Sequence, residues 1–239
     1  MTEALFSDVD IRYQHTDFYI VNKPCGASMH AQHDDESWFQ GLSEALAEPL
    51  WPVHRLDKDT SGALIVARSA EAAAWFGGAF TKRQIAKFYL AVGGHKPKKK
   101  QGLIQGDMVK ARQGSWRLTP TLNNPARTQF FSTSLATDTP SRLYLLKPLT
   151  GKTHQLRVAM KSLGAAIVGD QRYQGPIAAQ LHLHAYALCF QDANGTTIEC
   201  IIEPPATPWF KSAANALAER NWQQPWEITW PKVAELPRR

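Results

Sequence analysis

The sequence has few cysteines and no long apolar run. Three cysteines occur among 239 residues, and their odd number and wide spacing exclude a disulfide framework and a Cys-x-x-Cys zinc site. No apolar segment is long enough to span a bilayer, and the first residues lack a cationic start followed by an apolar stretch. Low-complexity tracts and internal repeats are also missing. These absences predict a globular cytoplasmic protein that does not enter membranes.

The sequence also lacks a phosphate-binding loop and a dinucleotide fingerprint. What it has is an excess of basic residues, since Lys and Arg total 27 against 21 for Asp and Glu, which gives a net charge of +6. This balance favours a polyanionic partner such as nucleic acid without demonstrating one. The length suffices for one sizeable core that needs no metal or disulfide.

Apolar periodicity and turn residues predict the secondary structure. The expected strands cover 17–22, 87–93, 127–133, 143–146, 181–188 and 197–203. Helices are expected over 35–47, after an N-cap at Ser69 and after an N-cap at Thr153. Gly77 and Gly78 inside the second helix predict a bend or a close packing partner. The basic run 95–102 predicts a solvated loop, with phosphate contact as the alternative.

The stretch 54–62, His-Arg-Leu-Asp-Lys-Asp-Thr-Ser-Gly, joins a dense polar loop to the apolar run 63–67. A buried strand can present a reactive loop in this way. Asp57 is the candidate nucleophile because it lies between Leu56 and the apolar run, with Arg55 nearby, so it can be ionised and poorly hydrated. The alternative is an aspartate in a strand-entry turn that accepts backbone hydrogen bonds, and Asp59 fits that description better.

A second motif covers 149–157, Leu-Thr-Gly-Lys-Thr-His-Gln-Leu-Arg, and is followed by Gly169-Asp170 and Tyr173. On the helix expected after Thr153, His154 and Arg157 are three residues apart and share a face, so they can point at one target. The alternative is a surface helix with an ordinary exposed arginine.

Together, in this order, the two motifs resemble the signatures of RluA-type pseudouridine synthases. The resemblance covers roughly residues 17–210. It implies an α+β fold with a long mixed, mainly antiparallel sheet, flanking helices and a central basic catalytic cleft. The domain organisation that follows is a catalytic domain over 1–210 and a Trp-rich extension over 211–239 packed on it.

The resemblance also implies roles for three catalytic residues. Asp57 would be the nucleophile or base, and Arg157 would meet its carboxylate. Tyr89 lies in a Lys-x-Tyr-x-Ala strand, and the family's tyrosine lies against the target base. Without the resemblance, Tyr89 would be interpreted as a core aromatic residue.

The implied partner is RNA, a tRNA or rRNA stem-loop, bound by a monomer. Arg55 would enter the stack that the flipped base leaves, and Lys152 and His154 would contact phosphate or ribose. No cofactor and no metal is implied, because the isomerisation is redox-neutral and consumes no water. Ala159 and the pair at 165–166 differ from residues common in relatives, which affects the substrate assignment more than the chemistry.

The sequence allows three rival interpretations. A catalytically silent RNA-binding or assembly factor could keep the fold, but the presence of all three catalytic residues argues against it. A kinase-like enzyme is set aside because the sequence has no Gly-rich loop and no Asp-Phe-Gly. A metal hydrolase could use His182 and His184, which project to one side of a strand, but no third ligand has a matching spacing, so a structural role is favoured.

Overall fold

The computed structural model describes residues 9–29, 37–94, 97, 99–136 and 140–232. The chain divides into two compact units. The first contains the residues up to Leu90 together with Ala179–Pro205, and the second contains Ala91–Ala178 together with the residues from Ala206 onward. Strand β5 (Ala86–Gly93) contributes residues to both units. None of the described helices combines the length and the hydropathy of a membrane-spanning segment.

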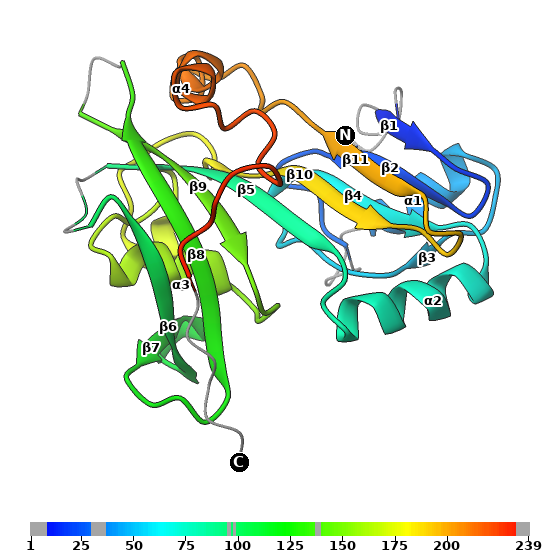
Figure 1. The fold of residues 1–239 in the computed structure, drawn as a ribbon, viewed down its shortest axis with the longest axis horizontal. Coiled ribbons are helices and arrows are strands. Elements are labelled where there is room, and N and C mark those ends of the chain that lie inside the picture. Colours follow the sequence, from blue (N-terminus) through cyan, green and yellow to red (C-terminus); the bar gives the residue numbers. More distant parts are fainter. Residues whose placement is uncertain (1–8, 30–36, 95–96, 98, 137–139, 233–239) are drawn as a thin grey trace. The chain divides into compact units, whose positions relative to one another are not determined.

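The first unit is a mixed sheet with two helices (Figure 1). Besides part of β5, its strands are β1 (Ile11–Gln14), β2 (Phe18–Lys23), β3 (Trp51–Pro52), β4 (Ser61–Ala67), β10 (Leu183–Gln191) and β11 (Thr197–Ile201). The order is β1-β2-β4-β10, while β3 pairs with β4 and β11 with β10. The β4–β10 pair is parallel, whereas β1–β2, β2–β4, β3–β4 and β10–β11 are antiparallel.

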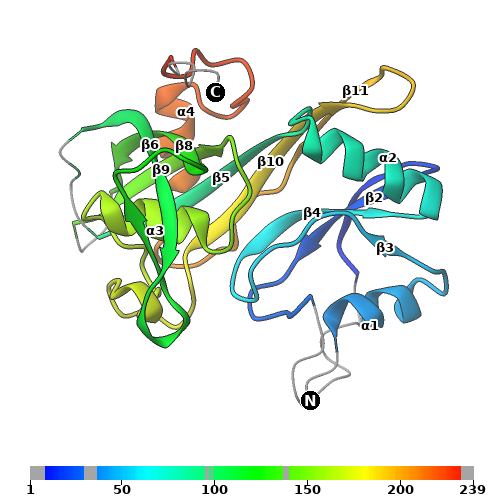
Figure 2. The same cartoon turned by 90° about the horizontal axis from the view of Figure 1, so that it is seen from below.

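Strand β4 is buried along its whole length, as its continuous apolar run predicts. Helix α1 (Trp38–Ala45) begins after Ser37, whose hydroxyl accepts a hydrogen bond from the Gln40 amide. Helix α2 (Ala70–Thr81) begins after Ser69, whose hydroxyl accepts one from the Ala72 amide. Helix α2 packs on β3 and β4 (Figure 2).

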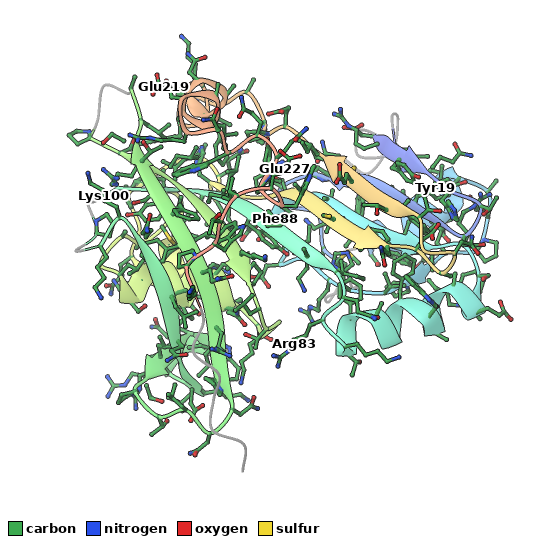
Figure 3. All side chains as sticks on the ribbon, viewed as in Figure 1. Tyr19, Arg83, Phe88, Lys100, Glu219 and Glu227 are labelled. Carbon is green, nitrogen blue, oxygen red and sulfur yellow. The ribbon has the colours of Figure 1, made fainter. Side chains whose placement is uncertain are left out.

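Aromatic side chains form much of the core of the first unit. The Phe18 ring meets the Phe76 ring edge to face, with centroids 5.2 Å apart, and lies 5.7 Å from that of Phe190. Phe88 on β5, labelled in Figure 3, is also completely buried. These contacts join α2 to strands that are distant in sequence, which fixes the helix against the sheet.

The second unit is built on an antiparallel sheet. Its strands are the end of β5, β6 (Gln101–Lys110), β7 (Trp116–Thr119), β8 (Pro125–Ser134) and β9 (Arg142–Pro148). The strand order is β9-β8-β6-β7, in which the neighbouring pairs β8–β9 and β6–β7 are also consecutive in the sequence. Helix α3 (Gln155–Ser162) packs on β7, β8 and β9 (Figure 1). Helix α4 (Ala213–Arg220) lies near the end of β8, where the Arg220 side chain donates to the Thr133 hydroxyl.

The Trp-rich C-terminal segment packs on the second unit. Phe131 of β8 contacts Trp222 and Trp230, with ring centroids 5.6 and 5.2 Å apart. The side chain of Gln129, two residues earlier on β8, donates a hydrogen bond to the Pro231 carbonyl. The segment therefore belongs to the packed structure, while the predicted domain limit at residue 210 stays a prediction.

The structure confirms the predicted α+β class and the mixed, mainly antiparallel sheet. Strand β6 was not predicted as a strand, and the predicted loop over 95–102 is shorter, because Gln101 and Gly102 already pair with β8. Residues 95, 96 and 98 of that loop, and 35–36 of the first predicted helix, lie outside the described residues. Both mid-helix glycines are accommodated within α2.

Candidate functional site

The loop between β3 and β4 carries the first motif, and its last turn closes on Asp57. The Thr60 amide donates a hydrogen bond to the Asp57 carbonyl over 3.0 Å. Leu56 is buried, with 4% of its surface exposed, whereas Asp57 is half-buried. Arg55 on the other side of Leu56 is exposed. Leu56 therefore anchors the loop in the core and leaves the Asp57 side chain partly in contact with solvent.

The end of β2 and the turn that follows it hold this loop by donating hydrogen bonds to the backbone carbonyls of the loop. Lys23 Nζ donates to the carbonyls of Pro24 and Lys58, each over 2.9 Å. The Gly26 amide donates to the same Lys58 carbonyl over 3.0 Å, and the Cys25 thiol donates to the Asp59 carbonyl over 3.1 Å. The residues that follow Asp57 are thus tied to a distant turn.

Lys23 is a site residue that sequence analysis missed. It is fully buried, and burial lowers the pKa of its amine to about 8, although nearby acidic groups, among them Asp59 and Asp57, oppose that shift. A positive charge therefore lies close to the Asp57 carboxylate within the first unit. The available signal was a lysine at the end of an apolar strand and directly before a Pro-x-Gly turn.

Tyr89 lies close to Asp57. Its side chain is buried on β5, and burial together with the negative charge of Asp57 raises the pKa of its phenol. The hydroxyl therefore stays protonated at neutral pH and can act as a hydrogen-bond donor. The first unit brings together two of the three predicted catalytic residues.

His54, at the start of the loop, is a neutral structural residue. Its Nε2 accepts a hydrogen bond from the Ile65 amide over 2.9 Å, and its ring centroid lies 4.9 Å from that of Phe80. Removal from water and the nearby ammonium of Lys87 lower the pKa of His54 to about 3. The imidazole joins the loop to β4 and α2 and is not placed for proton exchange near neutral pH.

His184 fastens the beginning of β4. Its Nδ1 lies 2.8 Å from the Ser61 hydroxyl, and its Nε2 lies 2.8 Å from the Ile202 carbonyl. No group of three or more potential metal-binding side chains exists among the described residues. Both ring nitrogens of His184 are therefore engaged in hydrogen bonds inside the first unit, which favours a structural role.

In the second unit, Arg157 forms a buried, bidentate ion pair with Asp170. Arg157 Nε and Nη2 lie 2.8 and 2.7 Å from the two carboxylate oxygens, and the guanidinium also lies 5.1 Å from the centre of the Tyr173 ring. This pairing holds the plane of the guanidinium in one orientation. Arg157 is therefore not the exposed helix residue of the alternative interpretation.

His154 meets the same tyrosine as Arg157. The Trp116 amide donates to the Tyr173 hydroxyl over 3.1 Å, and that hydroxyl lies 3.0 Å from His154 Nδ1. The Tyr173 hydroxyl therefore contacts both the Trp116 amide and the His154 imidazole. His154 lies just before α3 and does not share a helix face with Arg157, but both side chains contact Tyr173. Whether they point at one functional target stays a prediction.

The predicted N-cap at Thr153 is wrong. Helix α3 begins after His154, whose backbone is left-handed with φ of 56° and whose side chain makes no capping bond. The Gln155 side chain takes over the preceding loop, because its Oε1 accepts from the Thr150 hydroxyl and from the Lys152 amide. Lys152 Nζ in turn donates to the Asn124 carbonyl. A glutamine that stabilises the loop before its own helix leaves no recognisable capping pattern in the sequence.

The chain is similar to known RNA pseudouridine synthases in sequence. The pattern of the RNA pseudouridylate synthase family matches residues 17–162. A protein of Haemophilus influenzae described as an uncharacterized RNA pseudouridine synthase is 49% identical over 203 residues, which cover 81% of this chain and 88% of that protein. The dual-specificity RNA pseudouridine synthase RluA of Escherichia coli is 33% identical over 189 residues, which cover 74% and 84%.

The fold is similar to that of solved structures whose names also refer to RNA pseudouridylate synthases. The structure of human RNA Pseudouridylate Synthase Domain Containing 1 superposes with a TM-score of 0.72 and 26% identity, covering 85% of this chain and 86% of that one. Human RNA Pseudouridylate Synthase Domain Containing 4 gives a TM-score of 0.70, also at 26% identity, over 90% and 95% of the two chains. The sequence comparison and the structure comparison therefore find proteins of the same family.

Proposed function

The chain belongs to the RluA-type RNA pseudouridylate synthase family, and from this premise we propose that it isomerises a uridine in structured RNA with Asp57 as the catalytic carboxylate. The observation that carries the proposal is the environment of Asp57. The residue is half-buried in a loop with tethered carbonyls, and its charge interacts with both Lys23 and Tyr89.

The reaction breaks the bond from ribose C1′ to N1 of uracil and forms a bond from C1′ to C5. N1 gains a proton and C5 loses one, so atoms and electrons balance without an oxidant or a reductant. A carboxylate can serve as the nucleophile towards the base or the sugar, or it can assist proton removal from the ribose. Partial withdrawal of Asp57 from water strengthens it in each of these roles, because a poorly hydrated anion attacks more readily.

Tyr89 and Arg157 complete the proposed catalytic group. Tyr89 would lie against the uracil and take part in the loss of the C5 proton, and its buried position near Asp57 supports contact with the base. Arg157 would keep Asp57 ionised and oriented through a charge-assisted hydrogen bond, as the family motif implies. Its guanidinium is held in one orientation by Asp170, and a fixed donor loses less freedom when it binds.

The proposed substrate is a stem-loop of tRNA or rRNA, because a uridine in a loop or bulge leaves its stack at a cost of only about a few kcal/mol. Arg55 would fill the vacated stack, which fits its exposed position beside the buried Leu56. Lys152 and His154 would contact phosphate or ribose. The central basic cleft, the monomeric state and the cytoplasmic location stay predictions.

The test is tritium release from RNA that carries tritium at uridine C5. We expect Asp57→Asn to fold normally and to lower the release rate by a factor on the order of 10⁴ or more, as loss of a nucleophile does. The matched control is Asp59→Asn in the same loop, which removes a charge two residues away and should leave the rate near that of the wild type.

Turnover by Asp57→Asn near the wild-type rate would refute the catalytic assignment. A wild-type protein that binds RNA but releases no tritium from either tRNA or rRNA would instead favour the alternative of a silent RNA-binding or assembly factor.

A further inference from the structure

A hydrogen-bonded chain of three residues ends at the strand that follows the Asp57 loop. The Ile202 carbonyl can only accept, so Nε2 of His184, 2.8 Å away, carries the hydrogen. Burial lowers the pKa of His184 to about 4, so the ring is neutral at pH 7 and Nδ1 has a lone pair. The Ser61 hydroxyl, 2.8 Å from Nδ1, is therefore the donor. The direction of the chain is fixed from Ser61 to His184 to Ile202.

Ser61 lies where the Asp57 loop becomes strand. It directly follows the turn in which the Thr60 amide donates to the Asp57 carbonyl. The backbone of this region is also docked, because β4 pairs in parallel with β10 at His184↔Ser61 and Ala185↔Gly62. The side-chain bond from Ser61 to His184 thus fixes the C-terminal end of the turn that carries Asp57.

Lys23 holds the same turn at another point, through the Lys58 carbonyl. The segment from residue 58 to residue 61 is thus held at both ends by side-chain hydrogen bonds to residues distant in sequence. Release of either attachment would allow the preceding carboxylate to shift. A misplacement of about 1 Å in a catalytic group can cost about a hundredfold in rate.

We infer that His184 is a positioning residue for the reaction, acting through the Ser61 hydroxyl on the backbone that carries Asp57. The inference rests on the proposed function, in which Asp57 is the catalytic carboxylate. It goes beyond packing, since an apolar side chain could fill the site of His184 but could not accept the Ser61 hydroxyl bond while donating to Ile202. His184 itself lies in the interior, with 1% of its surface exposed, so we expect it to act without direct contact with RNA.

Two amide variants separate the two bonds of His184. In His184→Asn the amide oxygen can occupy the place of Nδ1 and accept from Ser61, but nothing reaches Ile202. In His184→Gln the amide nitrogen can occupy the place of Nε2 and donate to Ile202, but nothing accepts from Ser61. The two changes are similar in polarity and both leave one buried group unsatisfied, so their cost in stability should be comparable.

The measurement is the single-turnover rate of tritium release at saturating RNA, with the RNA affinity and the melting temperature of each variant. We expect His184→Gln and Ser61→Ala to lower the rate by about a hundredfold with unchanged RNA affinity, and His184→Asn to stay within about tenfold of the wild type. The double variant Ser61→Ala/His184→Gln should be no slower than either single variant, because both remove the same bond.

Leu188→Val is the control for stability alone. Leu188 is buried on the same strand, so its truncation should lower the melting temperature without changing the rate. The positioning inference is overturned if Ser61→Ala and His184→Gln turn over like Leu188→Val, or if His184→Asn is as slow as His184→Gln. That result would leave the proposed function intact as long as Asp57→Asn is inactive, whereas an active Asp57→Asn would refute the proposed function itself.

Discussion

The surroundings of Lys23 determine how easily its amine carries a charge. Lysine is almost never fully buried unless it is paired, yet Lys23 has no exposed surface. Its amine donates to two carbonyls and lies near carboxylates that favour its charge, but the cost of removing it from water is the larger effect and lowers its pKa to about 8. The amine nevertheless holds the Lys58 carbonyl in the loop that carries Asp57.

The depressed pKa of Lys23 has a consequence for stability that can be measured. Between about pH 8 and its ordinary pKa of 10.5, the unfolded chain holds a proton that the folded protein has lost. The free energy of unfolding therefore gains a contribution that rises with pH through this window. This contribution is absent in Lys23→Met. Across the pH window, the free energy of unfolding of the wild type should therefore rise by on the order of 3 kcal/mol relative to that of the variant.

The measurement is urea unfolding of both proteins at several pH values from 7.5 to 10.5, chosen to cover the window around the pKa of Lys23. Other titrating groups are common to the two proteins and cancel in the difference. The variant Lys82→Met, at an exposed position, controls for the removal of a lysine side chain from the same unit. A difference between wild type and Lys23→Met that does not change with pH would contradict the shifted pKa of Lys23.

At the scale of elements, glycine has opposite roles in two neighbouring segments. Gly62, in β4, adopts a φ of +105°, and a Cβ there would lie 2.3 Å from the Ala185 carbonyl oxygen of β10. Gly77, in α2, has no neighbouring atom within 4 Å of a Cβ. The first glycine lets the parallel strands approach, whereas the second only weakens its helix. In the part of the chain that the structure describes, neither Gly77 nor Gly78 has the predicted close packing partner.

Alanine substitutions at Gly62 and Gly77 should therefore change the free energy of unfolding in opposite directions. Gly62→Ala combines backbone strain with a clash against a main-chain oxygen, and we expect it to lower the free energy of unfolding by about 2–4 kcal/mol. Gly77→Ala should raise that free energy by up to about 1 kcal/mol, because alanine is the better helix former. Thermal and urea unfolding of the two variants measure both effects. Equal effects would show that the close approach at Gly62 does not matter.

At the scale of the whole molecule, the excess of basic residues is the relevant property. The net charge is +6, and both units present basic side chains at the surface. In the first unit these include Arg55 and Arg83, the latter labelled in Figure 3. In the second they include Arg172. Such a charge distribution attracts a polyanion over long range and releases counterions when the polyanion binds.

Binding of RNA should therefore weaken steeply as salt rises. We expect the logarithm of the association constant for tRNA or rRNA fragments to fall linearly with the logarithm of the KCl concentration. If Lys152 contacts a phosphate, Lys152→Met should reduce that slope by about one. Filter binding across a range of KCl concentrations measures both quantities. A flat salt response in the wild type would contradict the basic RNA-binding surface, and an unchanged slope in the variant would remove Lys152 from it.

Local patterns in the sequence determined much of the fold. The apolar run 63–67 became the buried strand β4, and Ser69 caps α2 as predicted. Both motifs, and with them the family, could be identified from the order of residues alone. This succeeded because strand alternation, helical periodicity and capping depend on neighbours within a few positions.

Only the tertiary structure decided how the site is supported. Lys23 and the Lys58 carbonyl are 35 residues apart, and Ser61 and His184 are 123 apart. Neither contact has a period or a spacing that a sequence would reveal. The same holds for the start of α3, where Gln155 replaces the expected cap. The identity of the reacting side chain is a property of the motif, whereas its position depends on partners that become neighbours only when the chain folds.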